Sequence, residues 1–399
     1  MTLINRLPPL RQKAQSLTIF RKLLSDPAVK GMLALADVTK QSVDEAVSAY
    51  ASFAASLFPH SLNWSEYLLN LVLEDENFYM LKRSQGEGPG EELEICLKEE
   101  LGILEELSRV QPEEISREIS FDGRLPRWQT SQIDFYTVYK QRMNEIHAHG
   151  YGIFAKYAAF VVEDGELVPV KNPDGVRLSQ LAGYERERSE LIGNTLALLK
   201  GLPAANALLY GDAGTGKSTT VKAVANEFKD RGLRLIELKK RQLHQIPKLV
   251  DYLSRNPLKF ILFIDDLSFT KDDDDFAALK AILEGSVSAR ADNLVVYATS
   301  NRRHLVKENF SDRDGDEVHQ NDTMEELISL SDRFGLTITF IKPGKDGYLS
   351  IVRELANQYG LRLSLEEVDA AAERFALSRG GRSPRVAKQC VEHLKAMEE

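Results

Sequence analysis

The sequence predicts an α/β protein whose core is a five-stranded parallel sheet flanked by helices, with a mainly helical region before it and a small helical region after it. Short apolar segments rich in Val, Ile and Leu alternate with helical ones between residues 206 and 340, which is typical of a buried parallel sheet. The rest of the chain shows mostly the three-to-four spacing of helices. We therefore expect three domains, at residues 1–150, 151–345 and 346–399.

Length and composition are those of a globular protein with more than one domain. The chain has 399 residues, of which 43% are hydrophobic and 28% are charged. Its formal net charge of −9 argues against a protein that coats a polyanion, although it leaves room for a local basic patch. Cys96 and Cys390 are too few for a disulfide framework or a four-cysteine metal site, so we expect a reducing, cytoplasmic compartment.

Neither a membrane span nor a secretory signal is expected. No run of about 18 apolar residues occurs, and the N-terminus lacks a continuous apolar stretch before a small-residue cleavage site. Residues 3–24 are mildly basic and amphipathic. We interpret them as a first helix that packs on its own domain, with a membrane-surface or partner-docking helix as the alternative.

The first 120 residues or so consist of helical segments. Residues 43–58 and 65–83 carry apolar positions at helical spacing. The glycine-rich stretch at 84–92 predicts a loop between two helical groups, and the loss of periodicity at 121–130 suggests a linker. The role of this region is left open.

A β-hairpin is expected just before the sheet, because Asp164-Gly165 lies between the apolar segments 157–162 and 166–170. The expected strands of the sheet are residues 206–210, 233–238, 259–264, 293–299 and 336–340. After residue 347 the pattern is helical again, at residues 348–360, 365–377 and 383–397.

A phosphate-loop motif lies between the first of these strands and the helix after it. It fits G-x-x-x-x-G-K-[ST] at every position: Gly211, Asp212, Ala213, Gly214, Thr215, Gly216, Lys217 and Ser218. Glycines let consecutive backbone N–H groups point at phosphate oxygens, and the start of the helix, which runs on through Thr219, adds to the attraction. Lys217 would bridge the β- and γ-phosphates of ATP, and the Ser218 hydroxyl would bind Mg²⁺. The alternative is a glycine-rich turn with a chance Lys-Ser.

An acidic pair ends the strand at 259–264. Asp265 and Asp266 follow it directly, at the sheet edge where ligands bind in such folds. Asp265 would hold Mg²⁺, and Asp266 would orient or deprotonate the attacking water. A simple polar turn is the alternative. We interpret the run Asp272 to Asp275 as a solvated loop rather than a second metal site.

Two further positions suit a γ-phosphate. Asn301, after the strand at 293–299, would lie between the phosphate loop and the acidic pair and sense the γ-phosphate or hold the water; Ser300 is the second choice. Arg333 lies just before the last strand and suits an arginine finger on a neighbouring subunit's ATP, with a surface ion pair as the alternative. The stretch Asp312 to Asp316 lacks the spacing of a calcium loop and predicts a polar insertion.

The last expected helix begins near Ser383, which can cap it, and Pro384 suits its first turn. Arg385 then projects from the start of this helix, where it would touch the nucleotide from the C-terminal domain. Arg382 is expected to be structural.

The order of these motifs resembles the AAA+ ATPases over roughly residues 179–399. The stretches GTGKSTTVKAVANEF, FILFIDDLSF, ATSNRRHLV, SLSDRFG and GRSPRVAKQ are similar to a bacterial AAA+ family known only as a domain of unknown function. The resemblance implies a P-loop NTPase core with a helical lid and with ATP and Mg²⁺ as cofactors. It implies Asp265 for Mg²⁺ and Asp266 as the catalytic acidic residue, although most AAA+ proteins carry Glu at the second position.

The resemblance also implies roles for residues farther along the chain. These are Asn301 as first sensor, Arg333 as finger and Arg385 as second sensor. Gly183-Tyr184 matches the segment that lines the adenine pocket in such proteins. The first 150 residues gain nothing from the resemblance.

These motifs are compatible with three functions. The first is a homo-oligomeric ATPase, with Arg333 acting in trans, that couples nucleotide state to remodelling or loading of an unknown macromolecular partner. The second is a non-hydrolysing or very slow ATP-dependent switch or scaffold, and the third is a small-molecule P-loop kinase. A nucleic-acid partner has weaker support: the basic residues at 239–241 would contact its phosphates, but a solvated basic loop is the alternative.

Overall fold

The computed structural model describes residues 7–267, 279, 283, 291–301 and 333–398. The chain forms two compact units, Met1–Lys156 and Tyr157–Glu399. We call them the N-terminal and the C-terminal unit and describe each by itself.

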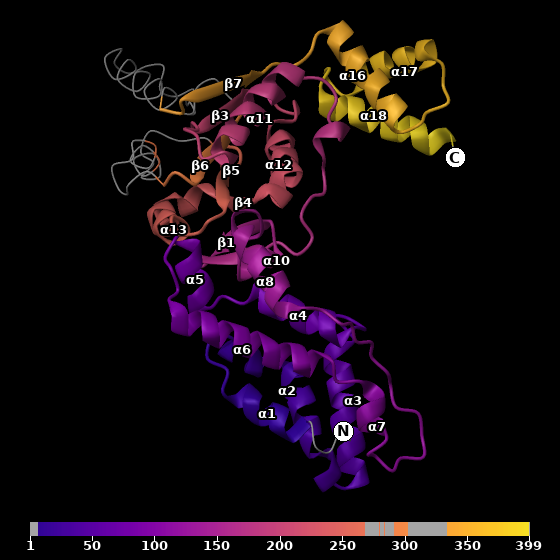
Figure 1. Cartoon of the computed structure of the whole chain (residues 1–399). Coiled ribbons are helices and arrows are strands. Elements are labelled where there is room, and N and C mark those ends of the chain that lie inside the picture. The colour runs from indigo at the N-terminus through magenta and orange to yellow at the C-terminus, as the bar shows by residue number, and fades with distance from the viewer. Residues whose placement is uncertain (1–6, 268–278, 280–282, 284–290, 302–332, 399) are drawn as a thin grey trace. The chain divides into compact units, whose positions relative to one another are not determined.

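The N-terminal unit is built from helices, as the sequence predicts. Its α-helices are α1 (Leu7–Gln15), α2 (Pro27–Ala34), α3 (Val43–Leu57), α4 (Trp64–Glu74), α5 (Phe78–Ser84), α6 (Glu91–Ser108), α7 (Pro112–Ser116), α8 (Phe135–Asn144), α9 (Ile146–His149) and α10 (Ile153–Lys156) (Figure 1). Two 3₁₀-helices, η2 (Arg21–Ser25) and η3 (Leu35–Lys40), lie between the first of them. The expected helical stretch at 65–83 is interrupted between α4 and α5, because the Asn77 side chain caps α5 by accepting from the Met80 amide at 2.9 Å.

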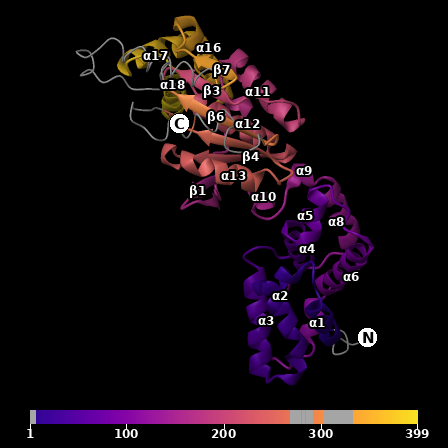
Figure 2. The same ribbon diagram turned by 90° about the vertical axis from the view of Figure 1, so that its left-hand side faces the viewer.

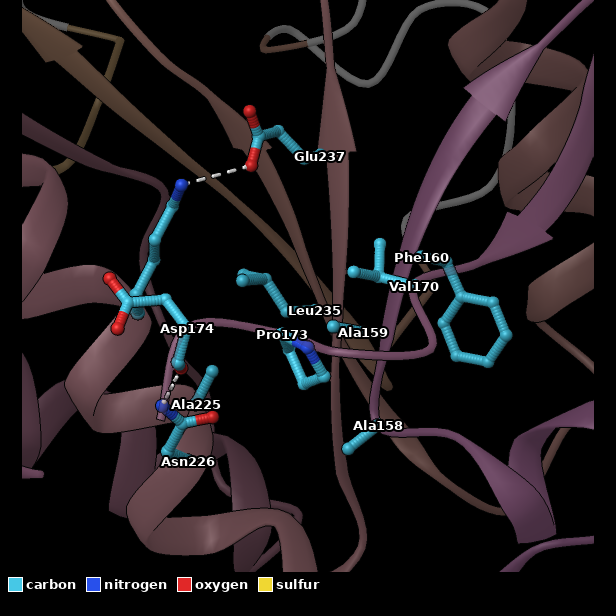
Figure 3. A pocket seen from close by; sticks show the side chains of 11 residues that line it. Ala158, Ala159, Phe160, Val170, Pro173, Asp174, Ala225, Asn226, Leu235 and Glu237 are labelled. Atoms are coloured by element: carbon cyan, nitrogen blue, oxygen red, sulfur yellow. Dashed lines mark hydrogen bonds and ion pairs between the residues drawn. The ribbon is translucent and has the colours of Figure 1, made fainter. Parts of the chain in front are cut away.

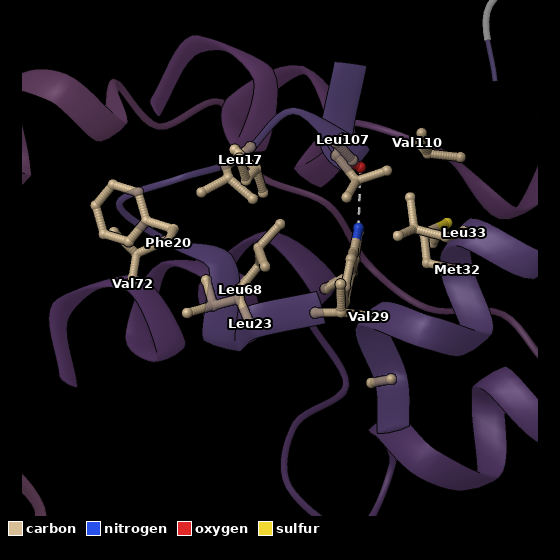
Figure 4. Close-up of a cluster of buried hydrophobic side chains, with 14 of the residues drawn as sticks. Leu17, Phe20, Leu23, Val29, Met32, Leu33, Leu68, Val72, Leu107 and Val110 are labelled. Carbon is tan, nitrogen blue, oxygen red and sulfur yellow. Dashed lines mark hydrogen bonds between the residues drawn. The ribbon is translucent and has the colours of Figure 1, made fainter. Parts of the chain in front are cut away.

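The core of this unit is a cluster of aliphatic and aromatic side chains with satisfied polar atoms (Figure 4). The buried Trp64 indole donates to the Leu107 carbonyl oxygen at 3.0 Å. Glu100, which is only 5% exposed, accepts from the amides of Thr18, Ile19 and Phe20 at 2.8 to 3.1 Å. These bonds offset the cost of burying a carboxylate in an apolar core.

The prediction of a linker at 121–130 is wrong, since part of this segment belongs to the core of the N-terminal unit. Trp128 is 3% exposed and packs on Phe53, with ring centroids 4.7 Å apart. Its indole donates to the Val110 carbonyl oxygen at 3.0 Å. A segment without helical periodicity is thus held by one large aromatic anchor.

The C-terminal unit contains a seven-stranded sheet of order β2-β1-β4-β5-β6-β3-β7. The strands are β1 (Ala159–Glu163), β2 (Glu166–Pro169), β3 (Ala207–Gly211), β4 (Leu233–Leu238), β5 (Lys259–Ile264), β6 (Leu294–Ser300) and β7 (Leu336–Phe340). The five expected strands all form and pair in parallel. The prediction that the sheet has only five strands is wrong, because the hairpin adds two. The expected hairpin joins the sheet because β1 pairs in parallel with β4, while β2 pairs antiparallel with β1.

Helices cover both faces of this sheet (Figure 2). Apolar side chains of α11 (Glu185–Leu199) and α12 (Lys217–Phe228) share one buried cluster with β3 to β7. On the other side of the sheet lies α13 (Ile246–Leu253), which follows the 3₁₀-helix η6 (Lys240–Gln245). Two shorter 3₁₀-helices, η4 (Leu178–Gln180) and η5 (Lys229–Arg231), complete this part. Two helical layers around parallel strands explain why the strands are almost wholly apolar.

The last three helices are α16 (Lys345–Gln358), α17 (Leu365–Ser378) and α18 (Pro384–Glu398), which share a buried cluster that Ala182 also joins. Ser364 and Glu367 form a capping box at the start of α17. We call α16–α18 the lid helices. None of the helices in the described ranges combines the length and the apolar character that crossing a membrane requires.

Candidate nucleotide site

The phosphate-loop motif connects β3 to α12 with a backbone that only glycine accommodates at key positions. Gly211 has φ +129°, and a Cβ atom there would lie 2.1 Å from the Phe340 carbonyl oxygen of β7. Gly216 has φ +92° and directly precedes α12. The strand, loop and helix that confirm such a motif are therefore all present.

Lys217 is held inside the loop. Its ammonium is in a side chain only 5% exposed, and it donates to the carbonyl oxygens of Gly211 at 3.0 Å and Asp212 at 2.7 Å. A third bond reaches the Asn301 Oδ1 atom at 3.0 Å. Burial lowers the pKa of Lys217, because desolvation disfavours the charged form.

Hydroxyl groups and a carboxylate gather where a magnesium ion is expected. The Ser218 and Thr299 hydroxyls each donate to the Asp265 Oδ1 atom at 2.6 Å. A hydroxyl and a carboxylate at this spacing fit Mg²⁺, which prefers oxygen ligands and is usually held by one or two protein groups together with substrate phosphates. Sequence reasoning overlooked Thr299, whose signal was a hydroxyl at the carboxyl end of the strand beside the acidic pair.

Asn301 links the phosphate-loop lysine to the acidic pair. Besides accepting from Lys217, it donates from Nδ2 to the Asp266 Oδ1 atom at 2.7 Å. Sheet order explains this position, because β6 lies between β3, which leads into the phosphate loop, and β5, which leads into the acidic pair. Ser300 is buried, with 2% exposure, at the end of the same strand.

Asp266 adopts a left-handed backbone conformation with φ +54°, which is uncommon for a residue with a side chain. Its amide donates to the Thr299 hydroxyl at 2.9 Å and to the Asp265 Oδ1 atom at 3.1 Å, and these bonds stabilise the turn. The turn aims the Asp266 carboxylate at Asn301. Such strain at a polar strand end is common at functional sites.

Gly183 and Tyr184 lie between the core and the lid helices. A Cβ atom on Gly183, at φ +69°, would lie 2.8 Å from the Ile351 side chain of α16. The Tyr184 ring packs on Phe340 with centroids 5.2 Å apart, and its hydroxyl donates to the Ile341 carbonyl oxygen at 2.7 Å. Burial raises the pKa of Tyr184 to about 12.

The start of α18 contacts the phosphate loop directly. The Arg385 amide donates to the Gly214 carbonyl oxygen at 3.1 Å. Ser383 caps the helix by accepting from the Val386 amide at 3.3 Å, as expected. Arg382 is structural in this geometry, since its guanidinium makes two hydrogen bonds to the Glu373 carboxylate at 2.8 and 3.0 Å.

Arg333 is not among the residues that converge on the phosphate loop. It precedes the amino end of β7, whereas Gly211 contacts Phe340 at the carboxyl end of that strand. The intervening strand of five residues spans roughly 17 Å. Arg333 therefore lies toward the amino end of β7, whereas the phosphate loop of the same chain lies at its carboxyl end.

Two other acidic runs named above, at 272–275 and 312–316, lie outside the described residues. A separate cavity of about 90 Å³ lies between α12 and the strands β1 and β4 (Figure 3). Ala159, Pro173 and Leu235 are among its lining residues, and none of the predicted site residues lines it.

Taken together, the sheet, the phosphate loop and the acidic strand end define a P-loop protein of the AAA+ type. The chain belongs to the family described as "Protein of unknown function (DUF815)", which it matches over residues 155–398. A search of curated proteins finds no match.

Among solved structures, the chain is similar to the RuvB Holliday junction branch migration motor of Thermotoga maritima, with 15% sequence identity and a TM-score of 0.38. The match covers 55% of this chain and 64% of the RuvB chain. A mutant of that RuvB shows 16% identity, coverages of 55% and 65%, and a TM-score of 0.38. The chain thus spans less than two thirds of the length of these RuvB chains.

Proposed function

We propose that this protein binds ATP with Mg²⁺ at residues 211–218 and hydrolyses it. The observation that carries the proposal is a set of hydrogen bonds at the carboxyl ends of the strands. Asn301 is bonded to both Lys217 and Asp266, and Ser218 is bonded to Asp265. The side chains to which we assign the phosphates, the metal and the attacking water therefore lie within hydrogen-bonding reach of one another.

Each residue then has a defined task. The loop amides and Lys217 hold the β- and γ-phosphates, and Ser218 and Asp265 hold Mg²⁺, which neutralises charge on the phosphates when bound. Asp266 orients or deprotonates the water, with Asn301 fixing its carboxylate. Gly183-Tyr184 lines the adenine pocket, and Arg385 contacts the nucleotide from the lid side.

The working form in this proposal is a homo-oligomer. Arg333 lies away from its own phosphate loop, so it can act as an arginine finger only on a neighbouring subunit's ATP. Hydrolysis would change the contacts between the core and the lid helices and so perform remodelling or loading of a macromolecular partner. In this scheme residues 1–150, 151–345 and 346–399 are three domains of a protein in a reducing, cytoplasmic compartment.

Steady-state phosphate release tests the proposal. Wild type should release phosphate from Mg²⁺-ATP, and Lys217→Ala should lose that release together with calorimetric ATP binding. Lys229→Ala is the matched control, because Lys229 is an exposed lysine of the same unit beyond the end of α12. Asp266→Asn should bind ATP yet release phosphate slowly. Equal release by wild type and Lys217→Ala would refute an ATPase at this site.

The alternative is an ATP-dependent switch that does not hydrolyse. Asp266 carries a shorter side chain than Glu, so water placement differs and turnover can be slow. This alternative requires Mg²⁺-dependent ATP binding by wild type without phosphate release that depends on Lys217. The two measurements above therefore separate the two functions.

A second candidate function, binding of single-stranded nucleic acid, is favoured by the segment 239–255. It contains five Lys or Arg residues against one Asp, in a chain of net charge −9. Lys248 and Tyr252, four residues apart on α13, are exposed on one face of the helix, Tyr252 by 55%. Arg255, just after the helix, is exposed as well, as is the single acidic residue, Asp251. Cations with an exposed aromatic ring suit a phosphate backbone and a stacked base.

Fluorescence anisotropy with a labelled single-stranded oligonucleotide tests this binding at two salt concentrations. Tyr252→Ala should weaken it roughly tenfold or more, and Lys248→Ala should weaken it and reduce its salt dependence. Lys229→Ala again serves as the control. Binding that is unchanged in both surface variants would exclude this face as the interface.

A further inference from the structure

The chain segment that joins the core to the lid helices is held by two parts of the nucleotide site. Residues 341–344, which we call the linker, leave β7 and enter α16 without helix or strand structure. The Lys342 amide of the linker donates to the Asp212 Oδ2 atom at 2.8 Å. The Tyr184 hydroxyl donates to the Ile341 carbonyl oxygen at 2.7 Å. The linker is thus bound once by the phosphate loop and once by the expected adenine segment.

Asp212 also makes one contact to β7 and two within the loop. Its amide donates to the Phe340 carbonyl oxygen at 2.9 Å, at the point where β7 passes into the linker. Its carbonyl oxygen accepts from the Lys217 ammonium at 2.7 Å and from the Thr215 hydroxyl at 2.8 Å. One residue therefore contacts both the phosphate-binding lysine and the linker.

The direction of the Asp212 carboxylate has an electrostatic reason. Within a loop that binds a triphosphate, a carboxylate aimed at the ligand would repel it. Here the carboxylate is instead bound to a backbone amide of the linker, and a charged acceptor makes this a stronger hydrogen bond than a neutral one. The charge is therefore used to hold the linker.

A bound triphosphate competes for the same lysine. Lys217 has three N–H donors, and in this structure all three have protein acceptors. When Lys217 turns to the phosphates, the Asp212 carbonyl oxygen loses its cationic partner, while the carboxylate of the same residue is bound to the linker. Only contacts that differ between two states can shift the balance between them, and this is such a contact.

Building on the proposed ATP binding, we propose that Asp212 is a positioning residue that transmits occupancy of the phosphate loop to the linker and so to the lid helices. Its carboxylate holds the linker, and its carbonyl oxygen responds to Lys217. Since the hydrogen bond to Lys342 needs only a side-chain oxygen, Asp212→Asn retains it and Asp212→Ala removes it. Comparing the two variants therefore shows the effect of losing the hydrogen bond to the linker.

Hydrogen exchange of the full-length protein, measured by mass spectrometry on peptides that cover residues 341–347, tests the proposal. Without nucleotide, the Lys342 amide should exchange about tenfold faster in Asp212→Ala than in wild type. A non-hydrolysable ATP analogue with Mg²⁺ should change exchange of this peptide in wild type and Asp212→Asn but not in Asp212→Ala, at concentrations that saturate each protein by calorimetry.

The outcomes distinguish this inference from the proposed function. If wild type does not bind the analogue, ATP binding is refuted, while the nucleotide-free comparison still tests the bond between Asp212 and Lys342. If wild type binds it and Asp212→Ala exchanges and responds as wild type does, the role of Asp212 is overturned and ATP binding stands.

Discussion

Gly211 should be the position in the phosphate loop that is least tolerant of a side chain. In Gly211→Ala the new Cβ atom would lie 2.1 Å from the Phe340 carbonyl oxygen at a φ of +129°. The backbone strain costs about 1 to 2 kcal/mol, the displacement needed to relieve the overlap about 1 to 3 kcal/mol, and the weakened bond from the Asp212 amide to Phe340 about 1 kcal/mol. We expect a loss of roughly 3 to 6 kcal/mol in the free energy of unfolding of the C-terminal unit.

Gly216→Ala is the matched control for steric overlap. Gly216 also has a positive φ, of +92°, but no atom would lie within 4 Å of its added Cβ. Strain alone then applies, and the expected loss is about 1 to 2 kcal/mol. The difference between the two variants measures the contact with β7.

The distribution of tryptophan makes the assay selective. Both tryptophans of the chain, Trp64 and Trp128, are buried in the N-terminal unit, so their fluorescence reports the unfolding of that unit. Far-ultraviolet circular dichroism reports both units. In urea, Gly211→Ala should shift a transition seen by circular dichroism to lower denaturant and leave the fluorescence transition in place. Equal shifts for Gly211→Ala and Gly216→Ala would refute the steric reasoning.

Three further changes test other parts of the C-terminal unit. Gly193→Ala, at a site in α11 where no atom would lie within 4 Å of the new Cβ, should stabilise the unit by about 0.5 to 1 kcal/mol in the same urea titration; a loss of stability would contradict the open space there. Asn293→Leu should cost about 2 to 4 kcal/mol, because the buried Asn293 amide donates to three carbonyl oxygens around the end of α13. Those of Asn256 and Leu258 would lose this donor, while that of Leu253 keeps its bond from the Asn256 amide. Arg353→Ala should reduce stability at neutral pH but not in acid. The hydrogen bond from Arg353 lowers the pKa of Asp369, so the advantage of wild type is present above the ordinary carboxyl pKa and disappears as pH falls through the lowered value; an advantage that persists in acid would point to packing instead.

Local patterns in the sequence were sufficient to predict the phosphate-loop motif and the boundaries of several strands. Strands β4, β5 and β7 begin and end at the predicted residues, because a run of apolar residues between turn residues defines a buried strand without reference to its neighbours. The phosphate loop is likewise a local structure, since its glycines and its lysine lie within eight consecutive residues. The Asp164-Gly165 turn formed as predicted, with positive φ at both positions.

The tertiary structure decided which of these local parts meet. Pairing of β1 with β4 brought the hairpin into the sheet. The sequence predicted that Asn301 lies between the phosphate loop and the acidic pair, and the position of β6 between β3 and β5 is the tertiary reason for it. Strand pairing, the burial of Trp128 and the bond from Lys342 to Asp212 all join residues far apart in the chain. Periodicity records only which face of an element is apolar and not which element covers it, so partners of this kind emerge only when the whole chain packs.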